Sequence, residues 1–190
     1  MTRTNGTQRT GTFVVLLLVL GGACSRSMAE AEATERGYSY DAYATLLRDH
    51  VNDSGRVDYH GLQRNRSGLD QFTAQMATLD PFVFAGWSEK KKMAFWINAY
   101  NSVTIKGILR EYPTTSIRNH TPKLFGYHIW NDLLLPVGDG VPVSLSEIEH
   151  KILREMNEPL IHFAIVCASR SCPRLLDEAY TARKINDQMA

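Results

Sequence analysis

The chain has 190 residues and a formal net charge of +1, from 21 lysines and arginines against 20 aspartates and glutamates. This length is enough for one domain with a hydrophobic core. The nearly balanced charge offers no strong attraction for nucleic acid or for an anionic membrane surface, so we expect no nucleic-acid partner.

The N-terminal residues have the three zones of an export signal. Arg3 and Arg9 lie in a polar stretch without acidic residues, and the apolar run FVVLLLVL follows at residues 13–20. This run is too short to cross a bilayer, which needs about 20 residues in a helix. We therefore interpret residues 1–23 as a signal peptide and the protein as exported.

The stretch LGGAC resembles a bacterial lipobox, in which a cysteine is acylated and becomes the new N-terminus. Gly21 stands where the usual pattern has Leu, three places before the cysteine. We expect Cys24 to carry the lipid and to anchor the protein to the membrane. Because Ser25 rather than Asp follows it, we expect an outer-membrane lipoprotein that faces the periplasm. The alternative is cleavage near Ala29, which would release a soluble periplasmic or secreted protein.

The remainder of the chain divides into a tether and a domain. Residues 24–37 are mostly small or charged, which is typical of a flexible tether. We assign residues 38–190 to a single α+β domain. Its last four residues carry no helix-ending signal, so we expect the domain to be incomplete at its C-terminus.

Three stretches of the domain have the apolar spacing of helices, namely residues 38–51, 69–79 and 88–112. Ser88 can cap the third, whose middle is apolar nearly all round, as in a central helix covered on several sides. Between the first two, Val57 and Tyr59 alternate with polar residues after the turn NDSG, which predicts a short extended piece.

The second half of the domain predicts a small sheet. Residues 133–137 and 141–143 flank the turn sequence GDG, which predicts a β-hairpin. IHFAIV, at residues 161–166, has the length and the branched residues of a buried strand. We therefore expect an α+β fold in which several helices pack on a small, partly antiparallel sheet, with one long central helix at about 88–112.

Two further helices are predicted around that strand. Ser144 begins the pattern SLSE, in which Glu147 completes a capping box, and this predicts a helix through about Met156. YTARKINDQMA, at residues 180–190, begins the last helix.

Five stretches occur in the order found in one family: DSGRVDYHGL, KKKMAFWINAYNSVTIKGIL, YPTTSIR, SLSEIEHKILR and IHFAIVCASRSCPRLLDEAYTARKI. Together they resemble the bacterial domain of unknown function 547, which occurs in envelope proteins and in plant proteins with a leucine-zipper segment. The resemblance covers about residues 43–190. The family's domain continues beyond the stretch similar to residues 173–190, which implies a C-terminally truncated chain. The resemblance implies no settled activity.

Asn98 and Asn101 share one face of the predicted central helix because they are three residues apart. Asparagine is unfavourable within a helix, so two of them in an apolar helix require a reason. One explanation is structural: the amides satisfy backbone groups of loops or strands and so organise the core. The other is that Asn98 orients a catalytic histidine, as an asparagine does in papain-like enzymes.

Two histidines are candidates for a general base. His150 lies in the capped helix, where Glu147 is better placed to pair with it than the neighbouring Glu149. The alternative for this group is a surface ion pair or a buried contact with a loop. His162 opens the predicted strand, on which it would point to the face opposite Cys167.

Cys167 and Cys172 are candidates for a disulfide or for a nucleophile. The chain has three cysteines, an odd number for an oxidising compartment, and acylation of Cys24 would leave these two as a pair. If reduced, Cys167 would have the following loop amides and Arg170 to stabilise a thiolate, and Cys172 could begin a helix that lowers its pKa.

Two functions stay open. The first is a non-catalytic envelope domain that binds or supports a protein or an envelope polymer; cysteine parity and strand phase favour it. The second is a thiol-dependent hydrolase or acyltransferase of papain or transglutaminase type. Its nucleophile would be Cys167 or Cys172, its base His150 or His162, and its orienting residue Asn98. We expect no cofactor and no metal site, because the histidines lack paired spacing and the cysteine pair has no companion.

Overall fold

The computed structural model describes residues 38–117, 128–138, 140, 142–168 and 172–190. The predicted signal peptide, Cys24 and the tether lie outside these residues. Within the described ranges, no helix combines the length and the apolar character that a membrane span requires.

Short helices precede the long helix in the chain: α2 (Asp41–His50), α3 (Tyr59–Arg64), α4 (Ser67–Ala77) and α5 (Pro81–Ala85). The predicted helices at 38–51 and 69–79 are confirmed as α2 and α4. These two helices pack against each other and bury Tyr43, Leu47 and Phe72 almost completely. Apolar packing therefore fixes this half of the fold.

The predicted extended piece is confirmed in part. Val57 forms an antiparallel bridge with Val51, so the chain between them makes a tight hairpin after α2. Tyr59 instead begins α3, because the carboxylate of Asp58 caps that helix by accepting a hydrogen bond from the Gly61 N–H at 2.9 Å.

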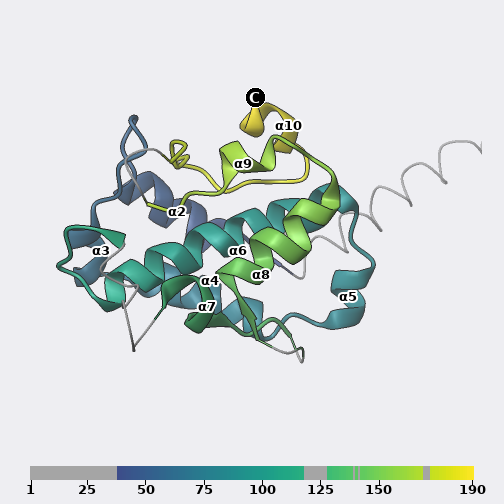
Figure 1. The fold of residues 1–190 in the computed structure, drawn as a ribbon, viewed down its shortest axis with the longest axis horizontal. Coiled ribbons are helices and arrows are strands. Elements are labelled where there is room, and N and C mark those ends of the chain that lie inside the picture. Colours follow the sequence, from purple (N-terminus) through teal and green to yellow (C-terminus); the bar gives the residue numbers. More distant parts are fainter. Residues whose placement is uncertain (1–37, 118–127, 139, 141, 169–171) are drawn as a thin grey trace, which may run out of the picture. The chain divides into compact units, whose positions relative to one another are not determined.

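The predicted central helix is confirmed as α6 (Glu89–Arg110). The Ser88 hydroxyl caps it by accepting from the Lys91 N–H at 3.3 Å. From Met93 to Leu109 the helix is buried on most of its circumference. Figure 1 shows α6 running through the middle of the described elements, where it can contact segments from both halves of the chain.

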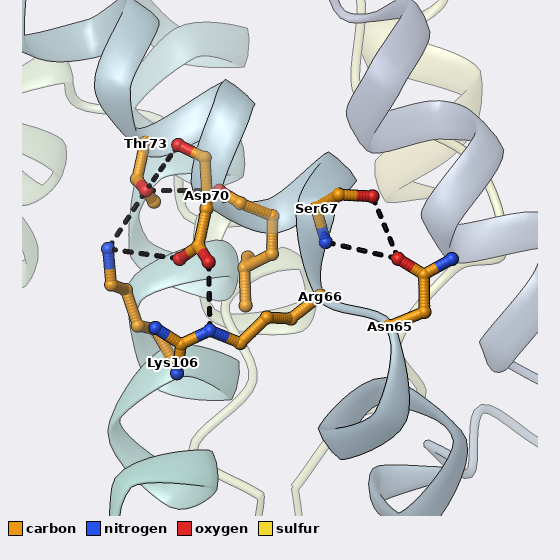
Figure 2. A network of polar contacts seen from close by, with 7 residues as sticks. Asn65, Arg66, Ser67, Asp70, Thr73 and Lys106 are labelled. Atoms are coloured by element: carbon orange, nitrogen blue, oxygen red, sulfur yellow. Dashed lines mark hydrogen bonds and ion pairs between the residues drawn. The ribbon is translucent and has the colours of Figure 1, made fainter.

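A polar network also joins α4 to α6 (Figure 2). Lys106 of α6 donates to the Thr73 hydroxyl at 3.0 Å and lies 3.6 Å from the Asp70 carboxylate. Arg66 binds the other oxygen of the same carboxylate at 2.8 Å. This network lies at the edge of the interface, because its charged groups stay partly exposed.

The predicted hairpin is confirmed, although its strands are short. β1 (Leu134–Leu135) pairs antiparallel with β2 (Val143–Ser144), and α7 (Ile129–Asp132) precedes it. Gly138, in the connection, has a φ of +55°, a left-handed conformation that a residue without a side chain adopts easily. The two strands are the sheet of the described residues, which gives the predicted α+β class.

The helix predicted after the capping box is confirmed and also ends at Met156. It begins as α8 (Leu145–Glu147), widens into the π-helix η2 (Ile148–Leu153) and tightens into the 3₁₀-helix η3 (Arg154–Met156). η2 packs against α6.

The predicted strand at residues 161–166 is wrong. Residues Ile161–Ala164 form the short helix α9, and Ile165 after it is extended. The backbone of this segment is paired with the side chain of Asn101 rather than with a neighbouring strand. The last helix, α10 (Ile185–Met189), begins later than predicted.

Candidate functional site

Asn98 and Asn101 bind the backbone of the C-terminal segment from the buried face of α6. The Asn98 amide donates to the Tyr180 carbonyl at 2.8 Å, and its oxygen accepts from the Tyr180 N–H at 2.9 Å. Asn101 donates to the Ala164 carbonyl at 2.9 Å and accepts from the Val166 N–H at 2.8 Å. Each amide therefore makes the pair of hydrogen bonds that a neighbouring strand would make, for a segment that pairs with no strand among the described residues.

Cys167 and Cys172 are joined in a disulfide, with their Cα atoms 6.1 Å apart. The Cys167 N–H donates to the Cys172 sulfur at 3.2 Å. Ala168, just inside the closed loop, has a φ of +54°, a conformation uncommon for a residue with a side chain. Because both sulfurs are oxidised, neither cysteine offers a thiolate in this state.

The Glu147 carboxylate binds Ser144 and Lys151 at the start of the helix and does not pair with His150. It completes the capping box with Ser144 and pairs with Lys151 at 3.0 Å. The Ser144 N–H and Lys151, in that order, lower the pKa of the Glu147 carboxyl below its usual value.

His150 lies beside Glu149 instead. Its Nδ1 is 4.0 Å from the Glu149 carboxylate, and about half of the His150 side chain is exposed. The same carboxylate accepts from the Tyr100 hydroxyl at 3.3 Å and lies 3.8 Å from Arg154. Around the Glu149 carboxylate, these side chains form a partly exposed polar cluster. Burial, together with the negative charge of Glu149, raises the pKa of the Tyr100 hydroxyl.

His162 lies on α9 and is exposed. The expected position of His162 on a strand face opposite Cys167 is wrong, because this segment is helical.

A cleft of about 890 Å³ lies where the hairpin after α2, the face of α6 and the described residues on either side of the disulfide loop meet. Its described lining consists of the following residues: Ser54, Gly55, Arg56, Val57, Tyr59, Asn101, Thr104, Ile105, Val166, Ala168, Cys172, Pro173, Arg174 and Leu175. It thus includes one of the two predicted asparagines and one of the two cysteines. Among these described lining residues there is no histidine, aspartate or glutamate.

Sequence reasoning missed the two arginines of the cleft. Arg56 and Arg174 lie in two of the quoted sequence blocks, DSGRVDYHGL and the block that ends in CPRLLDEAYTARKI. Nothing in either block indicates that they share a cleft, because only the folded chain brings these distant segments together. Among the described residues, no group of three histidine, cysteine or acidic side chains is arranged to hold a metal ion.

A model of the protein family described as "Protein of unknown function, DUF547" matches residues 84–190. The match covers more than half of the chain, and the chain belongs to this family. It contains both asparagines, the disulfide and Arg174, and it begins after Arg56. No curated protein and no solved structure matches the chain.

Proposed function

We propose that this protein is an exported, lipid-anchored protein of the bacterial cell envelope whose domain binds a partner in the cleft without catalysing a reaction. The observation that carries the proposal is the Cys167–Cys172 disulfide, which forms part of the cleft wall through Cys172. A wall built from an oxidised cysteine offers contacts to a ligand and no thiol nucleophile.

The disulfide also supports export. Such bonds persist in the periplasm and outside the cell, and they are rare in the cytosol. The signal-like residues 1–23 and the lipobox-like LGGAC agree with that environment. Acylation of Cys24 accounts for the third cysteine, and the protein would then face the periplasm from the outer membrane.

The size and chemistry of the cleft support binding. Its volume of about 890 Å³ lies within the range of small-molecule sites, roughly 300 to 1,000 Å³. Its described lining combines apolar side chains with a similar share of polar and charged ones, and the acid–base groups of the alternative mechanism, His150 and His162, are not among them. The partner would be a protein or an envelope polymer that inserts a small group.

Thiol labelling of the purified full chain tests the absence of a nucleophile. After denaturation without reductant, we expect no maleimide adduct in the intact mass of the acylated protein, and two adducts after reduction. The variant with Cys167→Ser and Cys172→Ser is the matched control and should take up no label in either state. Two free thiols in the native protein, one of them reacting abnormally fast at neutral pH, would instead support the thiol-dependent hydrolase or acyltransferase.

Metabolic labelling with an alkyne-bearing fatty acid tests the anchor. We expect the wild-type chain to be labelled and to fractionate with the outer membrane. The Cys24→Ser variant should lose both properties, and a label that survives this substitution would contradict the assignment of the lipidated residue.

A further inference from the structure

We propose that the cleft recognises an oxyanion, the carboxylate or phosphate group of a partly apolar ligand, through the guanidinium groups of Arg56 and Arg174. This inference rests on the proposed binding function and specifies the chemistry of the ligand. It is carried by the placement of two positive side chains in the lining of one cleft, one from the hairpin after α2 and one from the segment after the disulfide.

Hydrogen bonds to Asn52 fix the backbone of Arg56, and the guanidinium is left available to bind a ligand. The Asn52 side-chain oxygen accepts from the Arg56 N–H at 3.0 Å and from the N–H and hydroxyl of Ser54 at 3.1 and 2.8 Å. The Asn52 N–H donates to the Arg56 carbonyl at 3.1 Å. These bonds fix the tip of the hairpin. Within the described part of the chain, the exposed Arg56 guanidinium forms neither an ion pair nor a hydrogen bond.

Arg174 comes from the segment after the disulfide and packs against the same hairpin. It follows the disulfide closely in the chain, and its Nη1 donates to the Asp53 carbonyl at 2.8 Å across 121 residues of sequence. Its stem packs directly on Gly55, where an added Cβ would collide with the Arg174 Cγ. Gly55 also has a φ of +74°, so both the close approach and the backbone favour glycine.

The bond to Asp53 does not neutralise Arg174. A carbonyl oxygen carries no net charge, and a guanidinium has five N–H donors, so most of them remain for a ligand. Arginine presents these donors as a planar fork that matches a carboxylate or a phosphate.

The cleft lining carries positive charge from two arginines. Among the described lining residues there is no carboxylate. The nearby Asp58 carboxylate caps α3 and lies 3.9 Å from His50, and it does not line the cleft. Charges of one sign in a cleft attract a ligand of the opposite sign.

The remaining walls fit the body of such a ligand. Burial raises the pKa of the Tyr59 phenol, so its hydroxyl stays protonated at neutral pH and can donate to an anion. Ile105, Val166 and Leu175 supply apolar surface. A cleft of about 890 Å³ is far larger than a single carboxylate or phosphate, so the oxyanion would be one end of a larger molecule.

Titrations of the ¹⁵N-labelled full chain in detergent micelles test the proposal. The probes are N-acetyl-alanyl-alanine, its C-terminal amide and glycerol 3-phosphate. We expect at least one of the two anions to shift the amide signals of Gly55, Ile105 and Leu175, and the neutral amide to leave them unchanged. Which anion binds distinguishes a carboxylate from a phosphate source. Raising the salt concentration should weaken the binding.

Three variants assign the effect to the cleft. Arg56→Gln removes a guanidinium that forms no hydrogen bond or ion pair in the described part of the chain, so the fold should survive and the affinity should fall at least tenfold. Arg174→Gln should weaken binding similarly. Arg183→Gln removes an exposed arginine that does not line the cleft and should leave the affinity unchanged.

Three results would overturn the oxyanion assignment: equal binding of the acid and the amide, undiminished binding by Arg56→Gln, or no binding of either anion. None of these changes the expected pattern of thiol labelling. Free, reactive thiols would refute the non-catalytic function even if an anion binds.

Discussion

Two regions of the molecule share the apolar core but differ in how their backbones are held. The first is built by α2, α4 and α6, and the second consists of the described residues from 160 to the C-terminus. In the first, apolar side chains of regular helices pack together, and the rings of Tyr43 and Phe72 stack with their centroids 4.6 Å apart. In the second, the helices are only four and five residues long, and the connecting backbone is held by Asn98, Asn101 and the disulfide.

The difference shows how a chain with little regular structure can still be placed accurately. Apolar packing is non-directional, so it accepts many neighbours of suitable size. An amide that donates to one peptide group and accepts from another fixes both position and orientation. The cleft wall that Val166, Ala168 and residues 172–175 form belongs to the second kind, so its geometry depends on a few polar contacts in addition to apolar packing.

The largest effect is expected from a cavity in the helical region. Phe72→Ala removes a ring that is 1% exposed, and we expect it to lower the free energy of unfolding by about 3–5 kcal/mol in urea denaturation. Phe82, which is 89% exposed, provides the control, since Phe82→Ala should change stability by less than about 0.5 kcal/mol. Similar losses in both variants would contradict the burial on which the comparison rests.

Asn101→Ala should affect the C-terminal segment through polar groups rather than a cavity. It leaves the Ala164 carbonyl and the Val166 N–H without a partner, at an expected cost of about 2–4 kcal/mol. Hydrogen exchange should accelerate first at the Val166 N–H.

Ser102→Ala is the matched control on the same helix. Ser102 is fully buried, but its hydroxyl donates to the Ala99 carbonyl of its own helix, so the loss should be clearly smaller. If the two variants were equally destabilised, the asparagine would act by packing and not by binding the distant backbone.

Opening the disulfide should be less damaging and more local. Replacing both Cys167 and Cys172 with Ser should cost about 2 kcal/mol, the chain-entropy value for so short a loop. Hydrogen exchange should increase around Leu175 and remain unchanged around Phe72. Uniform acceleration over both regions would show that the segment is not a separate unit of stability.

The smallest effect concerns the helix start that lies between the two regions. Ser144→Ala removes the hydroxyl of the capping box and should cost about 1 kcal/mol at pH 7. The folded-state pKa of its partner Glu147 is lowered, so that carboxylate contributes stability above its unfolded pKa and loses it as the pH falls through the folded value. The difference between wild type and variant should therefore shrink in acid, and a difference that grew there would contradict the capping role of Glu147.

The sequence by itself determined the elements whose signals are local. Apolar spacing located α2, α4 and α6, the serine caps located the starts of α6 and α8, and the turn sequence located the hairpin. These signals suffice because helix periodicity, capping and turn geometry act over a few residues. The cysteine count also favoured the pair that forms the disulfide.

Only the tertiary structure decided the form of residues 161–166 and the existence of the cleft. A short apolar run is compatible with a strand or a buried helix, and here it forms a short helix whose C-terminal end is bound by Asn101, 63 and 65 residues away in the chain. Arg174 likewise meets the hairpin of Arg56 through a bond that spans 121 residues. Contacts at such separations leave no periodic trace in the sequence, because they form between segments that only the packed core brings together.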